Sequence, residues 1–365
     1  MGAGKTTCMI AMAKWLTYRG LRCGLITNDQ ADGLVDTALA LAGVEGGAGQ
    51  AVRQVTGGCF CCHANELGKA LLELDEEVRP NIFIAEPVGS CTDLVATVLL
   101  PLKEIYHGNL AAAPMSVVVD SRRLHDMVLK KLSKTSKLNF SRDVRYIYLK
   151  QLEEADIIIL NKKDLLNGGE MTRLINKLSM DWPRKKIIQV SARSGEGMDD
   201  WFSLVLDSES STPESLLNID YQRYGKGEAL LGWFNARLRL NNGPWEIDGD
   251  EFLEGLANNI KKRLQENGIE IAHFKMSLRS DENDKVGTSG LAVVNVVRND
   301  SPAEISLRMK ARVKAGEILI NLRAEGAPQM LKRIVLNEIK ELPLSLENVT
   351  AFKPAKPVPI YRVTA

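Results

Sequence analysis

The sequence lacks the features that mark proteins acting on nucleic acids, in membranes or outside the cell. Its 47 Lys and Arg residues nearly balance 46 Asp and Glu residues, so the formal net charge is only +1. This balance gives no reason to expect a nucleic-acid or membrane partner. No apolar run approaches the roughly 18 residues that a transmembrane helix requires, and no signal peptide is visible. We therefore expect a cytoplasmic protein.

Cysteine is present in a pattern that argues against a disulfide framework. The 365-residue chain contains 6 Cys, and they are clustered rather than spaced as in a small secreted domain. In a chain of this size, clustering favours thiol or metal chemistry over disulfides. Histidine is scarce, and no His-rich tract is present among the 4 His residues.

The chain is long enough for two domains, and its pattern of predicted strands and helices changes after residue 206. In residues 1–206, buried apolar runs alternate with helical patterns, which predicts an α/β domain with a mostly parallel, doubly wound sheet. The expected strands are Cys23–Thr27, Ile82–Ala85, Ser116–Val119, Asp156–Leu160 and Lys186–Val190. The expected helices are Thr6–Tyr18, Ala64–Val78, Cys91–Ile105, Met171–Leu178 and one after Asp199.

A polar stretch predicts a linker at residues 207–218, followed by a smaller α+β domain at residues 219–365. A split βαβ layout is one arrangement that fits the second domain. Its expected strands are Glu228–Leu240, Glu270–Leu278, Leu291–Val297 and Glu317–Leu322. Its expected helices are Glu251–Gln265 and Met330–Ile339.

A glycine-rich run at the start of the chain predicts a phosphate-binding loop, formed by Gly2, Ala3, Gly4, Lys5, Thr6 and Thr7. Glycines let backbone N–H groups approach phosphate oxygens, while Lys5 would reach the β- and γ-phosphates and Thr6 would bind Mg²⁺. The alternative is a glycine-rich start to an ordinary helix. The complete pattern has a further glycine and a central strand before the loop. We expect these to precede Met1, unless Met1 itself stands in the loop.

A second motif predicts a guanine-binding site at the ends of two later strands, with candidate residues Asn161, Lys162, Asp164, Ser191 and Ala192. The Asp164 carboxylate can accept hydrogen bonds from both N–H groups on the Watson–Crick edge of guanine. Adenine would leave that carboxylate unpaired, so the site would reject it. The alternative is a polar loop in which Asp164 caps a helix.

Acidic residues at two other strand ends are candidates for magnesium binding and for placing water. Glu86 follows a predicted strand and could hold Mg²⁺ through water, while the Gly89 N–H could sense the γ-phosphate. Asp29 follows the strand at Cys23–Thr27 and could meet Mg²⁺ or orient the attacking water. A simple turn residue is the alternative for Asp29.

Three thiols fall within four positions at Cys59, Cys61 and Cys62, after Gly57-Gly58. Thiolates select zinc and similar transition metals over magnesium and calcium. Three donors leave a fourth position open for water, a client side chain, His63 or Cys91. Thiols must lose protons to bind metal, so loading should weaken at low pH. The alternative is that these thiols are buried as small apolar groups.

Taken in order, these motifs resemble those of the CobW/HypB/UreG family of metallochaperone GTPases. The Cys-x-Cys-Cys run is similar to that of the CobW branch, and the resemblance covers roughly the first 205 residues. It implies GTP hydrolysis coupled to delivery of zinc or cobalt to a client metalloprotein or to a pathway such as cobalamin biosynthesis. GTP, Mg²⁺ and Zn²⁺ or Co²⁺ are the cofactors and cargo that it implies. The clipped phosphate loop and the missing His-rich tract depart from the family pattern.

We expect a slow GTPase in which Lys5 and Thr6 stabilise charge and Glu86 or Asp29 places water. The cysteine loop lies in the interval that moves with nucleotide in GTPases, so nucleotide state should change its geometry. The second domain would recognise the client or mediate homodimer formation. One alternative is a metal-storage or sensor protein with a vestigial nucleotide site. Another is a P-loop kinase or ATPase with structural cysteines. The metal and the client are left open.

Overall fold

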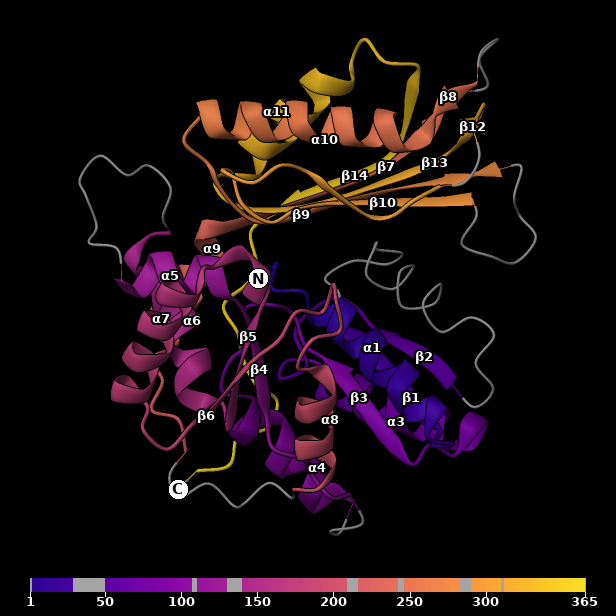
Figure 1. Cartoon of the computed structure of the whole chain (residues 1–365). Helices are drawn as coiled ribbons and strands as arrows, with labels where there is room; N and C mark the ends of the chain where they lie inside the picture. The colour runs from indigo at the N-terminus through magenta and orange to yellow at the C-terminus, as the bar shows by residue number, and fades with distance from the viewer. Residues whose placement is uncertain are drawn as a thin grey trace.

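The computed structural model describes residues 2–28, 50–106, 110–129, 140–208, 216–241, 246–281, 290–309 and 312–364. Its N-terminal part, coloured indigo to magenta, lies below a C-terminal part in orange and yellow (Figure 1). None of the described helices combines the length and apolar character that a membrane span requires.

Parallel strands and covering helices build the N-terminal part. Its strands are β1 (Cys23–Asn28), β2 (Gln50–Val55), β3 (Ile82–Glu86), β4 (Ser116–Asp120), β5 (Ile157–Asn161) and β6 (Lys186–Gln189). Its helices are α1 (Lys5–Tyr18), α3 (Ala64–Val78), α4 (Leu100–Ile105), α5 (Ser121–Leu129), α6 (Arg142–Glu154), α7 (Gly168–Asp181) and α8 (Met198–Leu206), with a π-helical turn at Val95–Leu99 and a 3-10 turn at Lys163–Leu165. The five strands expected in this part are all present, each to within one residue at either end.

The parallel strands form two three-stranded sheets, ordered β2-β1-β3 and β4-β5-β6. Every residue of the central strands β1 and β5 is buried. Their unbroken apolar runs therefore reflect cover on both faces. Strand β2 was not expected, because its sequence, Gln-Ala-Val-Arg-Gln-Val, is neither an unbroken apolar run nor a strict alternation of apolar and polar residues. Its Arg53 pairs with Glu73 and Glu77 of α3.

An antiparallel sheet covered by two helices forms the C-terminal part. Its six strands are ordered β11-β10-β9-β13-β7-β14. They are β7 (Leu231–Leu240), β9 (Glu270–Ser280), β10 (Leu291–Val296), β11 (Glu304–Leu307), β13 (Gly316–Glu325) and β14 (Leu344–Phe352), beside a short pair β8 (Ile247–Asp248) and β12 (Arg312–Val313). Helices α10 (Gly249–Glu266) and α11 (Pro328–Ile339) pack on one face and bury the main apolar core (Figure 1).

The strand expected from Glu228 begins later, at Leu231, because residues Tyr221–Leu230 form the helix α9. Asp220 caps this helix, and its side chain accepts hydrogen bonds from two backbone N–H groups of the first turn. Gly225 and Gly227 lower the helix propensity of this segment, but they allow it to pack closely against neighbouring residues. A Cβ at Gly227 would lie 2.6 Å from the carbonyl oxygen of Asp143 on α6. The two helices can therefore approach closely only because position 227 has no side chain.

The helix expected over Cys91–Ile105 begins later, with the π-helical turn at Val95. Two local features of the backbone explain why the helix does not begin at Cys91. The Cys91 N–H donates to the Val88 carbonyl at 2.8 Å in a tight turn, and Asp93 adopts a left-handed conformation with φ 63°. Non-glycine residues rarely adopt this conformation, so the surrounding contacts must hold it.

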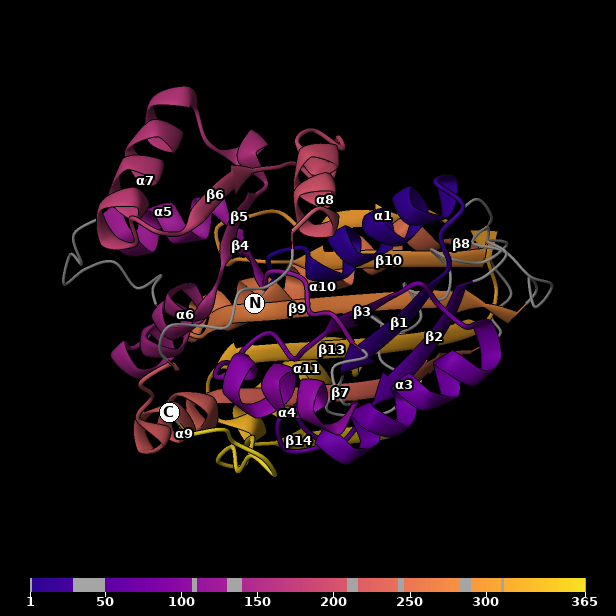
Figure 2. The same cartoon turned by 90° about the horizontal axis from the view of Figure 1, so that it is seen from below.

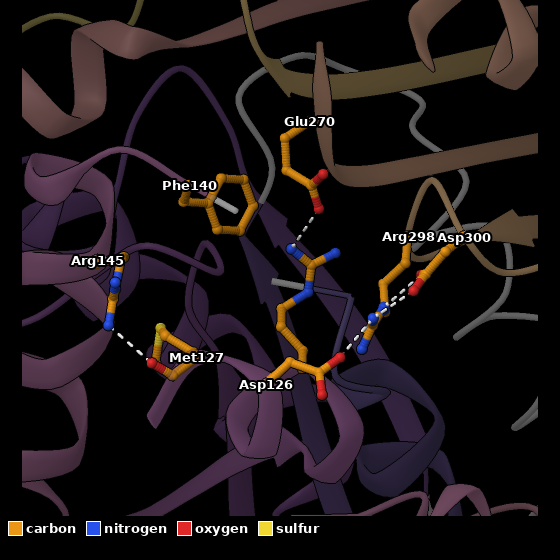
Figure 3. Close-up of a pocket in the computed structure, with 8 residues that line it drawn as sticks. Asp126, Met127, Phe140, Arg145, Glu270, Arg298 and Asp300 are labelled. Carbon is orange, nitrogen blue, oxygen red and sulfur yellow. Dashed lines mark hydrogen bonds and ion pairs between the residues drawn. The ribbon is translucent and has the colours of Figure 1, made fainter. Parts of the chain in front are cut away.

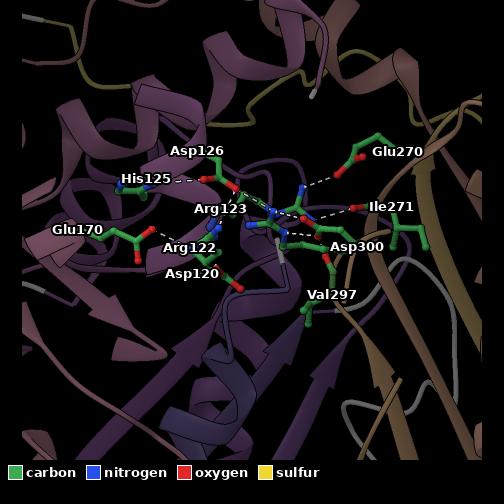
Figure 4. A network of polar contacts seen from close by, with 11 residues as sticks. Asp120, Arg122, Arg123, His125, Asp126, Glu170, Glu270, Ile271, Val297 and Asp300 are labelled. Atoms are coloured by element: carbon green, nitrogen blue, oxygen red, sulfur yellow. Dashed lines mark hydrogen bonds and ion pairs between the residues drawn. The ribbon is translucent and has the colours of Figure 1, made fainter. Parts of the chain in front are cut away.

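Buried ion pairs join the two parts of the chain, as Figure 4 shows. Arg123 of α5 donates to Glu270 Oε1 at 3.3 Å, to the Ile271 carbonyl at 2.9 Å and to the Val297 carbonyl. Arg298 donates to Asp126 at 2.9 Å. These charged side chains also line a small pocket, which Figure 3 shows. Phe140 and Arg145 of the N-terminal part line the same pocket. Separating the two parts would leave buried charges without partners, which is costly.

Candidate functional site

The phosphate-loop residues lead directly into α1. Gly4 is the N-cap of this helix, with φ 87°, and Gly2 also has a positive φ of 61°. A Cβ at Gly4 would lie 2.6 Å from Asn161 Nδ2, so a larger residue would displace that side chain. Ala3 and Thr6 are buried, whereas Thr7 is exposed. The loop thus presents backbone N–H groups at a helix N-terminus, which is a suitable site for phosphate.

Glu86, at the end of β3, lies beside the phosphate-loop side chains. The Thr6 hydroxyl donates to Glu86 Oε1 at 3.1 Å, and Lys5 Nζ lies 3.3 Å from the same oxygen. Glu86 Oε2 is buried and has no hydrogen-bond partner among the described residues. A hydroxyl and an unpartnered carboxylate oxygen are hard ligands of the kind that Mg²⁺ prefers. These residues therefore fit a magnesium ion at the phosphates.

Asn161 and Lys162 connect the end of β5 to the phosphate loop. Asn161 Nδ2 donates to the Ala3 carbonyl at 2.7 Å, and Lys162 Nζ donates to the Gly2 carbonyl at 2.9 Å. Lys162 Nζ also lies 2.9 Å from Asp120 Oδ2. Burial opposes ionisation of Asp120, but the Lys162 charge and a hydrogen bond from the Arg123 N–H hold its pKa below the ordinary value. The two nucleotide motifs thus meet at one edge of the sheets.

Asp164 and Ser191 lie together at the same edge, on adjoining loops. The Ser191 hydroxyl donates to Asp164 Oδ1 at 2.9 Å, and the Ala192 N–H donates to Asn161 Oδ1 at 2.9 Å. Asp164 is exposed to solvent. An exposed carboxylate is accessible to the edge of a purine base. Asp29, the other acidic candidate, lies outside the described residues.

The three cysteines of the Cys-x-Cys-Cys run converge in a tight turn. The N–H groups of Cys62 and His63 donate to the Cys59 carbonyl at 2.9 and 3.0 Å. Cys59 Sγ lies 2.7 Å from Cys61 Sγ and 3.3 Å from Cys62 Sγ, and the last two sulfurs are 3.8 Å apart. All three are free thiols, and they form a group compact enough to hold one metal ion.

The electrostatics of the cluster favour one thiolate shared among neighbouring thiols. Contacts with Cys61, then Cys62 and Cys91, lower the pKa of Cys59 far below that of an ordinary thiol. Contact with Cys59, then with Cys62, together with burial, raises the pKa of Cys61. A metal ion would supply the positive charge that the other thiols need to ionise.

Asn28 is a site residue that the sequence did not identify. It is buried at the end of β1, and its Nδ2 donates to the carbonyls of Val55 and Gly58 at 3.0 and 2.7 Å. Its Oδ1 accepts from the N–H groups of Phe60 at 3.1 Å and Val88 at 3.4 Å. One side chain therefore fastens the cysteine loop to the loop after Glu86. Its place at the end of a buried strand was the only signal in the sequence.

The C-terminal segment, residues 353–364, returns over the N-terminal part (Figure 1). The Val358 N–H donates to Cys62 Sγ at 3.3 Å, and the Ile360 N–H donates to the Cys61 carbonyl at 3.0 Å. Arg362 Nε lies 2.7 Å from the buried carboxylate of Asp93. The sequence gave no sign of these contacts, because about 300 residues separate the partners.

The site combines a glycine-rich loop at a helix N-terminus, the loop at residues 161–164 and a thiol cluster. This arrangement suits a nucleotide-binding protein with a candidate metal centre. The family model described as "CobW/HypB/UreG, nucleotide-binding domain" matches residues 1–189. The chain belongs to the CobW/HypB/UreG family.

A curated relative is the zinc chaperone CobW of Sinorhizobium sp, which is 28% identical over 206 residues. The matched region covers 54% of this chain and 57% of that protein, so the chain spans little more than half of the relative's length.

Two solved structures are also similar. Hydrogenase maturation factor HypB from Archaeoglobus fulgidus has a TM-score of 0.37 and 17% identity, covering 56% of this chain and 84% of its own. Zn(II)-bound YjiA GTPase from E. coli has a TM-score of 0.31 and 13% identity, covering 92% of this chain and 95% of its own.

Proposed function

We propose that the protein is a GTP-hydrolysing metallochaperone. It would bind a transition-metal ion at Cys59, Cys61 and Cys62 and transfer it to a client protein or a cofactor pathway. Thiolate ligands favour zinc, with cobalt as the second choice. The observation that carries this proposal is the position of Asn28, which contacts both the cysteine loop and Val88. Through it, a change at the nucleotide would reach the metal ligands.

In this proposal, Lys5 and the N–H groups at the start of α1 bind the β- and γ-phosphates. Thr6 and Glu86 would hold Mg²⁺, which would supply charge neutralisation at the transferring phosphoryl group. Glu86 orients the attacking water, and Asp29 is the other candidate for that role. Gly89 donates its N–H to the γ-phosphate. Intrinsic turnover is slow until a partner completes the site.

The guanine base would be bound by a second set of residues, namely Asn161, Lys162, Asp164, Ser191 and Ala192. Exposure of Asp164 supports its role as acceptor for the guanine N–H groups. Asn161 and Lys162 support the arrangement by contacting the phosphate loop, at Ala3 and Gly2.

Nucleotide selectivity tests the guanine site. The protein should bind GTP at least about 100-fold more tightly than ATP, and Asp164→Ala should remove most of that preference because the base loses its acceptor. Asp200→Ala is the matched control, since Asp200 is also exposed but lies on α8. Binding is measured by calorimetry and turnover by phosphate release. Equal affinity for ATP would contradict the assignment.

Metal binding in two nucleotide states tests the coupling. Zinc affinity should differ between the protein bound to a non-hydrolysable GTP analogue and the protein bound to GDP. The same zinc affinity in both states would refute the coupling. Zinc binding without any GTP turnover would instead favour a storage or sensor protein.

We further propose that residues 1–206 form the GTPase domain, residues 207–218 the linker and residues 219–365 the client-binding or dimer-forming domain. The described contacts between the two parts support a role in which the C-terminal part responds to the nucleotide state of the N-terminal part. The client is a metalloprotein or an enzyme of a metal-cofactor pathway, such as cobalamin biosynthesis, and the protein acts in the cytoplasm.

A further inference from the structure

The loop after Glu86 brings a fourth thiol to the cysteine cluster. Cys91 lies two residues beyond Gly89, in a tight turn that its N–H closes by donating to the Val88 carbonyl at 2.8 Å. Cys91 is 4% exposed and belongs to the same apolar cluster as Cys59, together with Val88 and Trp233. Its thiol interacts with that of Cys59. Cys59 is therefore the cysteine of the run that packs against the cluster containing Cys91, while Cys91 itself lies outside the compact group formed by the other three sulfurs.

The backbone around Cys91 is held from two sides. Gln151 Nε2 of α6 donates to the carbonyls of Cys91 and Gly89 at 2.7 and 3.2 Å. From the C-terminal part, Arg323 donates to Ser90 Oγ at 2.7 Å, and the Tyr224 hydroxyl donates to the Ser90 carbonyl at 3.2 Å. These contacts fix the main chain on either side of the Cys91 side chain.

His63, the other candidate for a fourth ligand, is engaged elsewhere. A Cβ at Gly58 would lie 2.5 Å from two atoms of the His63 ring, so the ring packs against the glycines at the start of the loop. Its Nδ1 lies 3.7 Å from Glu66 Oε2 on α3. Both contacts hold the imidazole against the glycine turn and the helix.

One of the three thiol spacings already matches that around a tetrahedral ion, and the other two are shorter. Zinc–sulfur bonds of about 2.3 Å in a tetrahedron place the sulfurs about 3.8 Å apart. Cys61 and Cys62 already have this separation, at 3.8 Å. Cys59 lies 2.7 Å from Cys61, so this pair must open by roughly 1 Å as an ion enters. The Cys91 sulfur lies outside the compact group of three and must approach them as the ion enters.

We propose that Cys91 is the fourth thiol ligand of the transition-metal ion held by Cys59, Cys61 and Cys62. This inference rests on the proposed metal-carrying function. Buried Arg323, paired with Glu228 at 2.9 Å, lies near enough to offset part of the negative charge of four thiolates. Because Cys91 lies five residues after Glu86, the loop that senses nucleotide also carries a metal ligand. Displacing that loop withdraws one of the four donors and opens a position for a client.

The number of sulfur ligands tests this proposal directly. The reduced, full-length chain is loaded with one equivalent of Co²⁺ as a spectroscopic probe, and separately with Zn²⁺ for X-ray absorption. The wild-type protein should show four sulfur ligands. Cys91→Ala should show three sulfurs and one lighter atom, and its cobalt–thiolate charge-transfer absorbance should fall by about a quarter.

Cys23→Ala is the matched control, because Cys23 is also a buried cysteine but lies on β1, outside the cluster. It should keep four sulfurs. If Cys91→Ala does not fold, Cys91→Ser provides a substitution of similar size with an oxygen donor. Three sulfurs in the wild-type protein would overturn the role of Cys91 and leave the metallochaperone proposal standing. Failure of the wild-type protein to bind either metal would instead overturn the proposed function.

Discussion

At the scale of single residues, the site depends on a few buried polar groups with several partners each. Asn28 makes hydrogen bonds to four backbone groups in three segments of the chain. Glu86 differs from Asn28, because its Oε2 is buried and has no hydrogen-bond partner among the described residues. A buried amide that makes all its hydrogen bonds holds the segments around it in place. A buried carboxylate oxygen without a partner is instead a position where a bound ligand would be stabilised most.

Removing the Asn28 side chain should loosen the cysteine loop. Asn28→Ala leaves the backbone groups at Val55, Gly58, Phe60 and Val88 without this partner. We therefore expect the free energy of unfolding to fall by about 2–4 kcal/mol. Urea denaturation measures this change. The control is Asn81→Ala, which removes an exposed acceptor for the Arg22 N–H and should cost less than about 1 kcal/mol. Equal losses in both variants would contradict the role assigned to Asn28.

At the scale of elements, the C-terminal segment acts as a cover for the thiol cluster. It contacts Cys61 and Cys62 through backbone N–H groups, and it is fastened at its far end by Arg362 and Asp93. The Val363 N–H adds a hydrogen bond of 2.9 Å to the Ala96 carbonyl. The segment therefore lies against two of the three cysteines.

Loosening the segment should expose Cys62. Arg362→Ala removes the charged partner of the buried Asp93 carboxylate, which keeps its hydrogen bond from the Tyr221 hydroxyl. Because the Arg362 side chain is partly exposed, the pair is worth about 1 kcal/mol. We expect alkylation of Cys62 by iodoacetamide to become about five- to tenfold faster in the metal-free protein, since 1.4 kcal/mol corresponds to about tenfold. Mass spectrometry measures the rate. Lys353→Ala, an exposed change in the same segment, is the control and should leave the rate unchanged.

At the scale of the whole molecule, buried charges hold the two parts together. Arg123 supplies hydrogen bonds to one carboxylate and two carbonyls of the C-terminal part. Burial raises the pKa of Glu270, while the nearby Arg123 charge opposes that shift. The same interface lies beside the phosphate loop, since a Cβ at Gly2 would lie 3.3 Å from the Ala272 carbonyl. The position of the C-terminal part is therefore tied to the nucleotide site.

Arg123→Ala should destabilise the molecule strongly. It leaves Glu270 and the two carbonyls buried without donors, so the free energy of unfolding should fall by about 3–5 kcal/mol. The neighbouring Arg122 pairs with Glu170 at 3.1 Å in a more exposed position, and Arg122→Ala should cost about 1 kcal/mol or less. Thermal and urea denaturation compare the two variants. Similar losses would show that the buried network does not hold the parts together.

The strands and the motifs could be predicted because their signals are local. Buried parallel strands such as Ile157–Asn161 appear in the sequence as unbroken apolar runs. Helix α9 was missed because its glycines lower helix propensity, and only packing of Gly227 against α6 compensates for them. Strand β14 was missed because most of its residues lie half-buried or exposed at the edge of the sheet. Edge strands carry a weak hydrophobic pattern.

The sequence by itself determined which chemical groups this protein has and in what order they occur: a glycine-rich run before a helix, a Cys-x-Cys-Cys run and the motif at residues 161–164. These follow from residue identity and spacing within short segments. Only the tertiary structure decided which groups meet. Asn28 with Gly58 and Val88, Cys91 with Cys59, and the C-terminal segment with Cys62 are contacts across 30 to 296 positions. Such contacts depend on how whole elements pack, which no local pattern encodes.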